Sequence, residues 1–240
     1  MKALSIFFLI ACFAVNTVCG MDDGSKPGKL VLVFRHMIGG EELVLGNPFS
    51  NILGDTITVQ KFKYYLSNFS ITDDKGNQTI LSPEYFLVDE ADPLSKTINL
   101  SVPNTSISSI QFLLGVDSIK NVSGVQEGAL DPLKGMFWTW NSGYIMAKLE
   151  GSSPSSRAAG SIFTYHIGGF RSPMQTMRTI TLSVPRNDNS EIIVTADINQ
   201  WFSNGFALRI GETPVCHSPG PLAVRIADNY SKMFSINSSH

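Results

Sequence analysis

The 240-residue chain has little charge and few cysteines, and both shortages limit what it can do. Charged residues make up 16% of it, the formal net charge is -2, and no basic block occurs, so nothing favours nucleic acid or an anionic membrane as a partner. Its three cysteines are Cys12, Cys19 and Cys216. The first two fall in a segment that we expect export to remove, which leaves no intramolecular disulfide. Stability then has to come from a hydrophobic core.

The sequence also lacks the common signatures of catalysis. It contains no Gly-x-Ser-x-Gly turn, no phosphate-binding glycine loop, no His-Glu-x-x-His and no Cys-x-x-Cys-His haem site. Cys216 has no recognisable set of partners beyond the adjacent His217. We therefore predict that the protein is not an enzyme.

Long apolar runs are scarce, and the clearest one lies at the N-terminus. Lys2 precedes an apolar run over residues 4–15, and Val18-Cys19-Gly20 follows, which is the layout of a secretory signal peptide over residues 1–20. The run of about 12 residues is shorter than a membrane-spanning helix requires, so we predict no transmembrane segment. Residues 21–240 are predicted to form one exported domain that is periplasmic, secreted or at the cell surface. Cys19 leaves a second processing route open, in which it carries a lipid anchor.

Alternating apolar and polar residues indicate that most of this domain is β-sheet. The segments that read as strands are residues 30–34, 62–71, 97–102, 110–116, 137–149, 162–166, 179–184 and 192–198. Turn-forming residues separate neighbouring strands at 73–77 and 186–189. Residues 222–234 instead repeat apolar side chains at helical spacing, just after two prolines. We predict a mainly β protein, an antiparallel β-sandwich with one C-terminal α-helix.

Four histidines supply the candidate metal ligands. His36 and His166 each follow an apolar strand and precede a Gly-Gly turn. A strand end holds a side chain firmly and glycines let a ligand come close, which suits a metal-binding imidazole. Both could instead be partly buried histidines bonded to loop carbonyls. His217 is a weaker candidate, because Cys216 beside it points the opposite way on an extended chain, and His240 is the last residue.

Aromatic and acidic residues offer fewer possibilities. Trp138 and Trp140 share one face of a candidate strand. This face could belong to the core, or it could be a surface on which a ligand stacks. An unmodified indole only donates a hydrogen bond, so a metal role would require oxidation first. Asp117, Asp131 and Glu150 suit turns and caps; they could also bind calcium, although no spacing places two of them together.

Several blocks together give a specific resemblance. The most distinctive are residues 63–68 (Lys-Tyr-Tyr-Leu-Ser-Asn) and 138–140 (Trp-Thr-Trp), and residues 166–169 (His-Ile-Gly-Gly) are a further block. With them the chain resembles the MbnP family, periplasmic proteins first met beside methanobactin copper-uptake genes and related to the MopE and CorA copper proteins. The resemblance covers nearly all of the chain after residue 20. It implies a β-rich exported protein that sequesters or delivers copper.

The resemblance also implies how copper would be held. In the family, two histidines join a tryptophan that a partner dihaem oxidase, MbnH, has oxidised to kynurenine. Ring opening gives an aromatic amine with a nitrogen lone pair, and imidazole suits copper. His36 and His166 match the family's histidine motifs, and Trp138 or Trp140 would be the modified residue. In MopE and CorA the modified tryptophan lies two residues before a ligand histidine, whereas Phe34 stands there in this chain, so either tryptophan would have to reach the histidines through the fold.

Two further functions fit the same residues. A β-sandwich binding module could stack Trp138, Trp140 and Tyr144 on a carbohydrate or a peptide. An accessory to an oxidoreductase could instead cycle copper between redox states. Copper-dependent spectra would favour the metal-binding hypothesis over the binding module, and turnover with an electron donor would identify the accessory.

Overall fold

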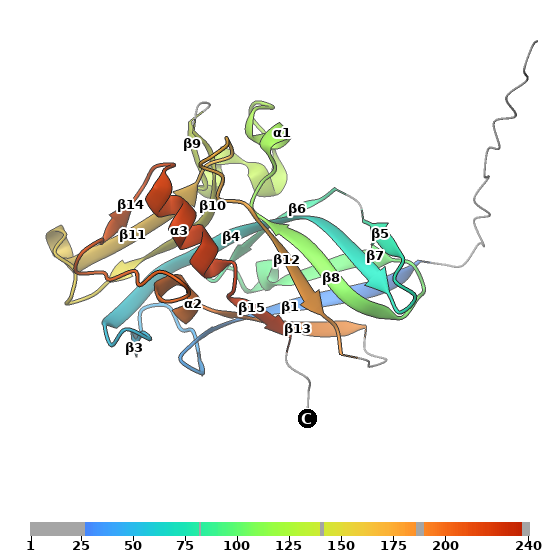
Figure 1. The fold of residues 1–240 in the computed structure, drawn as a ribbon, viewed down its shortest axis with the longest axis horizontal. Helices are drawn as coiled ribbons and strands as arrows, with labels where there is room; N and C mark the ends of the chain where they lie inside the picture. Colours follow the sequence, from blue (N-terminus) through green and yellow to red (C-terminus); the bar gives the residue numbers. More distant parts are fainter. Residues whose placement is uncertain (1–26, 82, 140–141, 186–189, 237–240) are drawn as a thin grey trace, which may run out of the picture.

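The computed structural model describes residues 27–81, 83–139, 142–185 and 190–236. Two β-sheets face each other across one large apolar core (Figure 1), which confirms the predicted mainly β sandwich. Residues 1–20, Trp140, the turn at 186–189 and His240 lie outside the described residues, and so do Cys12 and Cys19. No helix in the described part of the chain is long and apolar enough to cross a membrane.

The smaller sheet is built around β1 (Gly28–Ile38). This strand pairs in parallel with β13 (Glu191–Asp197) and antiparallel with β7 (Thr97–Val102) and β2 (Glu41–Glu42). On the far side of β13 lies β15 (Phe234–Ile236). Alternate side chains of β1 are buried, as the period-two pattern predicted: Leu30, Leu32, Phe34 and His36.

The larger sheet is organised around β4 (Thr56–Asp73), a strand of 18 residues. Its neighbours are β8 (Ile107–Leu114) and β10 (Gly143–Ser152), and the shorter strands β3 (Pro48–Ser50), β5 (Gln78–Ile80) and β6 (Tyr85–Asp89) also pair with it. Outside β8 lies β12 (Arg178–Ser183), and outside β10 lie β11 (Ile162–Gly168) and then β14 (Val215–Cys216). Because β11 and β14 are parallel, as β1 and β13 are, the sandwich is mixed rather than wholly antiparallel.

The strand predicted over residues 137–149 is divided in two. The first part is β9 (Phe137–Thr139), which folds back on the beginning of β10. Gly143 starts β10 with a φ of 72°, a conformation that glycine adopts without strain. The chain between β8 and β10 also contains α1 (Ser118–Asn121), η2 (Gly128–Leu130) and η3 (Pro132–Lys134), and it rises above the sheets at the top of Figure 1.

The predicted C-terminal helix is confirmed as α3 (Pro221–Tyr230), with Pro221 in its first turn. Its apolar face is fully buried, and it closes the core between the sheets beside β11 (Figure 1). It ends earlier than the apolar pattern suggested, because Phe234 belongs to β15. The expectation of a single helix was too simple, since α1, α2 (Asn199–Phe202) and the 3-10 turns η1 (Pro93–Lys96) and η4 (Ala159–Ser161) are also present.

Candidate metal site

His36 lies in the core between the two sheets, with 1% of its surface exposed. Its Nδ1 lies 2.6 Å from a carboxylate oxygen of Glu90, and its Nε2 lies 2.9 Å from the hydroxyl oxygen of Tyr64. Burial lowers the pKa of His36, although the Glu90 carboxylate acts in the opposite direction. Both ring nitrogens therefore already have partners, and these are side chains rather than the loop carbonyls that the sequence suggested.

His166 lies on the outer face of the larger sheet, near the end of β11. Its Nε2 is 2.7 Å from an oxygen of Glu150, whose other oxygen is 2.9 Å from the ammonium group of Lys61. Burial alone would raise the pKa of Glu150, but the bonds from Lys61 and His166 outweigh it and hold that pKa below its usual range. Burial lowers the pKa of the partly covered His166.

The strand register places His36 and His166 on opposite sides of the larger sheet. Tyr64, which touches His36 in the core, is in register with Ala147 of β10. His166 is in register with Lys148, the next residue along β10. Because successive side chains of a strand point to opposite faces, His166 points away from the core. The structure therefore does not bring together the two histidines that the family resemblance predicts as a ligand pair.

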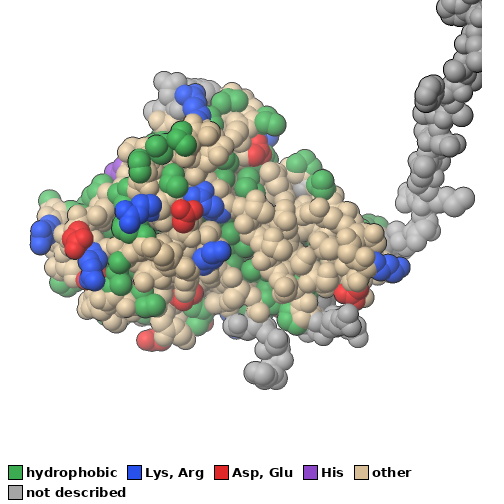
Figure 2. Space-filling view, viewed as in Figure 1, with side chains coloured by type: hydrophobic (Ala, Val, Ile, Leu, Met, Phe, Trp, Pro, Cys, Tyr) green, Lys and Arg blue, Asp and Glu red, His purple; other side chains and the backbone are tan. Residues whose placement is uncertain are grey.

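It places His217 beside His166 instead. The parallel strands β11 and β14 put Cys216 in register with Tyr165. The next residue along the chain is a histidine in both cases: His166 on β11, and His217 directly after the end of β14. The two imidazole rings are stacked with centroids 4.3 Å apart and an angle of 23° between their planes. Cys216 is buried and His217 is exposed, so the adjacent sulfur and nitrogen point apart, as predicted. Histidine surface appears at the upper left edge of Figure 2, where Figure 1 places β11 and β14.

Trp138 of β9 completes this group. A Cβ atom added to Gly168 would lie 2.7 Å from Cζ3 of the Trp138 indole, so the ring rests directly on this glycine. Gly168 is two residues after His166 on β11 and therefore shares its face of the sheet. Gly168 thus allows a close approach, and the group that approaches is the Trp138 indole. The second candidate, Trp140, lies outside the described residues.

Lys148 connects the segment that precedes Trp138 to the histidine site. Its ammonium group donates a hydrogen bond of 2.5 Å to the carbonyl oxygen of Gly135 and lies 3.8 Å from the Glu150 carboxylate. Burial is the main reason that the pKa of Lys148 is lowered. Gly135 ends η3 with a φ of 71°, immediately before β9. One nearly buried cation thus joins the Trp138 segment and the carboxylate that holds His166.

The remaining acidic candidates serve as helix caps. Asp117 caps α1 and also accepts a hydrogen bond from the hydroxyl of Tyr85, and Asp131 caps η3. In the described part of the chain, no three His, Cys, Asp or Glu side chains are grouped closely enough to hold a metal. A copper site at the histidine pair would need a third ligand from another source.

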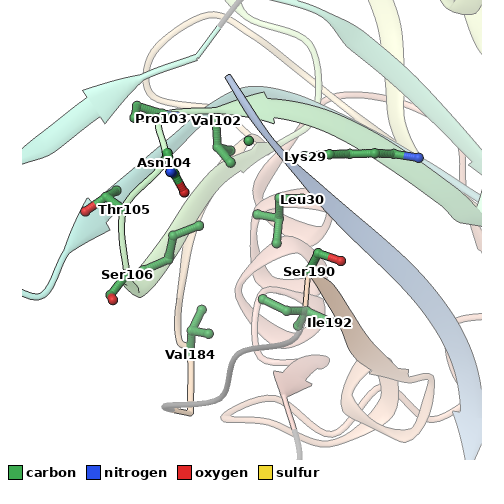
Figure 3. A pocket seen from close by; sticks show the side chains of 12 residues that line it. Lys29, Leu30, Val102, Pro103, Asn104, Thr105, Ser106, Val184, Ser190 and Ile192 are labelled. Atoms are coloured by element: carbon green, nitrogen blue, oxygen red, sulfur yellow. The ribbon is translucent and has the colours of Figure 1, made fainter. Parts of the chain in front are cut away.

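Two other places were candidates for binding a ligand. Tyr144, expected on an aromatic surface with Trp138, is buried, and its hydroxyl donates to the carbonyl of Leu130, so it offers no face to a sugar. The second place is a cavity of about 410 Å³, which opens where apolar side chains from β1, β7 and β13 converge (Figure 3). Its described lining residues include no histidine, cysteine or carboxylate.

Fold and site together define a β-sandwich protein with a stacked histidine pair and a tryptophan at one sheet edge. The family model for MbnP matches residues 27–218, and the chain belongs to the MbnP family. Among solved structures, MbnP from Methylosinus trichosporium is similar, with a TM-score of 0.60 and 18% sequence identity over 90% of this chain and 100% of that chain. At this identity the likeness concerns the fold alone. No curated protein sequence matches the chain.

Proposed function

We propose that this protein binds copper as a cargo, which it sequesters or delivers without turning over a substrate. Membership of the MbnP family suggests a methanobactin-associated role, and the residues described above suggest where copper would be held. The observation that carries the proposal is the stacked pair of His166 and His217 beside the indole of Trp138. Imidazole nitrogens are good copper ligands, and the exposed His217 gives access from solvent.

Glu150 would determine which ring nitrogen of His166 binds copper. The carboxylate accepts a hydrogen bond from Nε2–H, so the lone pair of the neutral ring lies on Nδ1. Histidine ligands in proteins commonly donate their second nitrogen to a carboxylate, which fixes the orientation of the ring. The cation of Lys61 keeps Glu150 ionised for this role.

Trp138 would supply the third ligand after oxidation to kynurenine. Opening the five-membered ring and removing its C2 carbon frees an aromatic amine, which has the lone pair that an indole lacks. Trp138 is partly exposed beside Gly168, on the same face as His166, so an enzyme at the surface could reach it. A dihaem oxidase of the MbnH type is the partner we propose. Copper binding at this site would not use His36, whose ring nitrogens are bonded to Glu90 and Tyr64 in the core.

We also propose that the protein acts outside the cytoplasm, either in the periplasm or at the cell surface. The apolar segment at residues 4–15 supports export, and Cys19 is the residue that a lipid anchor would use. An N-terminal peptide from native protein would distinguish the two routes, since plain cleavage leaves a free amine and lipidation adds the mass of acyl chains to Cys19.

The proposal is tested on protein purified from its native host. Copper content and the mass of the peptide that contains Trp138 are measured on the same sample. We expect near-stoichiometric copper and a gain of about 4 Da on that peptide, the change from tryptophan to kynurenine. An unmodified peptide in a preparation without copper would contradict the proposed function.

A further inference from the structure

The buried polar group around His36 is a second place where chemistry is possible. The Tyr64 hydroxyl lies 2.9 Å from Nε2 of His36, and the other ring nitrogen lies 2.6 Å from Glu90. The Glu90 carboxylate can only accept a hydrogen bond, so Nδ1 of the neutral ring keeps its proton and donates to it. Nε2 then carries the lone pair and accepts the hydrogen bond of the Tyr64 hydroxyl. Lys96 lies 3.0 Å from the same Glu90 oxygen and helps to keep that carboxylate ionised. Tyrosine, histidine and glutamate thus form a continuous chain in the core.

This arrangement sets Tyr64 apart from the other tyrosines. The chain has six, and four of them donate to backbone carbonyls, which are not bases: Tyr65, Tyr144, Tyr165 and Tyr230. Tyr85 donates to the carboxylate of Asp117. The Tyr64 hydroxyl instead faces an imidazole nitrogen, which can take up its proton.

We propose that Tyr64 is a redox-active residue whose proton acceptor is His36. A one-electron oxidant at the protein surface removes one electron from the Tyr64 phenol, and the hydroxyl proton passes to Nε2 of His36. The oxidant is reduced by one electron. The products are a neutral tyrosyl radical and an imidazolium ion, whose charge Glu90 stabilises at 2.6 Å. Return of one electron and the proton restores both side chains.

Burial explains why the base is needed. Tyr64 is fully buried, and loss of solvent raises its pKa well above the ordinary range, so the phenol does not ionise by itself. An oxidised phenol that kept its proton would be an unpaired cation in an apolar core, which is costly. Transfer of the proton across the hydrogen bond to His36 leaves the oxidised phenol neutral. The positive charge then lies on the imidazolium, beside the Glu90 carboxylate.

A line of aromatic rings connects Tyr64 with the region beneath the histidine site. The ring centroids are 5.3 Å apart from Tyr64 to Phe62, 6.1 Å from Phe62 to Trp201, and 4.7 Å from Trp201 to Tyr230. The Nε1 of Trp201 is buried, and no described residue accepts a hydrogen bond from it. An oxidised Trp201 therefore has no base to accept its proton, and it would regain an electron from a neighbouring side chain of this line.

The far end of this line approaches Trp138. The Tyr230 hydroxyl donates to the carbonyl of Thr176, and Thr176 is bonded in turn to Gly169, which adjoins the glycine under the indole. Tyr64 could thus supply an electron to an oxidised group at the surface site. That use of the electron rests on the proposed function, whereas the redox activity of Tyr64 does not.

The experiment uses the copper-free full chain, so its outcome is independent of metal binding. A light flash with a quencher generates tris(bipyridine)ruthenium(III) as the oxidant, and tyrosyl radicals are followed by transient absorption and electron paramagnetic resonance. We expect a tyrosyl signal that Tyr64→Phe removes and Tyr65→Phe, at the next residue of β4, leaves unchanged. His36→Gln can still hydrogen-bond but cannot take up the proton, and it should slow radical formation about a hundredfold.

Deuterated solvent gives a test on the unaltered protein, which does not depend on how the variants fold. Radical formation should slow in deuterated solvent because the hydroxyl proton moves with the electron. The proposal is overturned by a wild-type chain that forms no tyrosyl radical, by an unchanged signal in Tyr64→Phe, or by His36→Gln reacting at the wild-type rate. A rate that does not depend on the solvent isotope would also overturn it.

Discussion

His166 and His217 stack with their ring centroids 4.3 Å apart because the parallel pairing of β11 and β14 places Tyr165 opposite Cys216. The contact brings together residues from two distant parts of the chain. It also provides two imidazoles on the outer face of the sheet, where Trp138 covers Gly168. The proposed copper site consists of His166, His217 and Trp138.

The contact between Trp138 and Gly168 is tested by Gly168→Ala. The added methyl group would lie 2.7 Å from the Trp138 ring and 2.6 Å from the carbonyl oxygen of Tyr144, so the indole or the strand must move. We expect a loss of about 1–3 kcal/mol in the free energy of unfolding, together with a change in tryptophan fluorescence. Gly28→Ala is the control, because its nearest contact is an ordinary 3.5 Å. Equal stability of the two variants would contradict the contact.

Lys148→Met tests the connection between the Trp138 segment and the sheet. The substitution keeps most of the apolar side chain but removes the donor to the Gly135 carbonyl. We expect urea unfolding to show a loss of about 1–3 kcal/mol. Lys63→Met removes a partly exposed ion pair with Asp89, for which about 0–1 kcal/mol is expected. If the Lys63 variant were the less stable of the two, Lys148 would not have the proposed structural role.

The buried histidine predicts how stability depends on pH. The pKa of His36 is lowered in the folded protein, so below its ordinary value of 6.5 the unfolded chain binds more protons than the folded one. The contribution of His36 to the free energy of unfolding should therefore be greatest above pH 6.5, should fall between pH 6.5 and the lowered pKa of His36, and should stay constant below that pKa. The pKa values of Glu90 and Glu150 are also lowered, and their contributions are lost at still lower pH.

Urea unfolding at a series of pH values measures this effect in the wild-type chain and in His36→Gln. The variant has no imidazole at this position, so its loss of stability just below pH 6.5 should be smaller. A steeper loss in the variant than in the wild type would show that His36 is protonated more readily in the folded state.

Local patterns were enough to predict most of the longer strands and the last helix, but not short strands such as β2, β3 and β14. The alternation in β1, β7 and β13 reflects burial of one face, and the proline before the apolar repeat marks the beginning of α3. The division between β9 and β10 was missed because the apolar content continues across it. The only local sign was Gly143, whose backbone conformation favours glycine.

Which residues lie together at the histidine site could not be predicted from the sequence, because it depends on pairing between strands that no single segment specifies. That His36 faces the core while His166 faces outward follows from the register of β4, β10 and β11. The neighbour of His166 depends on a parallel pairing with the two-residue strand β14, which has no recognisable pattern of its own. The glycines after His166 did indicate a close approach, but they could not identify Trp138 as the approaching group.

The central claim is tested most directly by copper binding to variants of native-host protein. Copper per chain is measured by equilibrium dialysis for the wild type, His166→Gln, His217→Gln and His36→Gln, after each is shown to be folded. We expect near-stoichiometric copper in the wild type and in His36→Gln, and a loss of at least about tenfold in affinity when either stacked histidine is replaced. Copper binding that survives both stacked-histidine substitutions but is lost in His36→Gln would contradict the account.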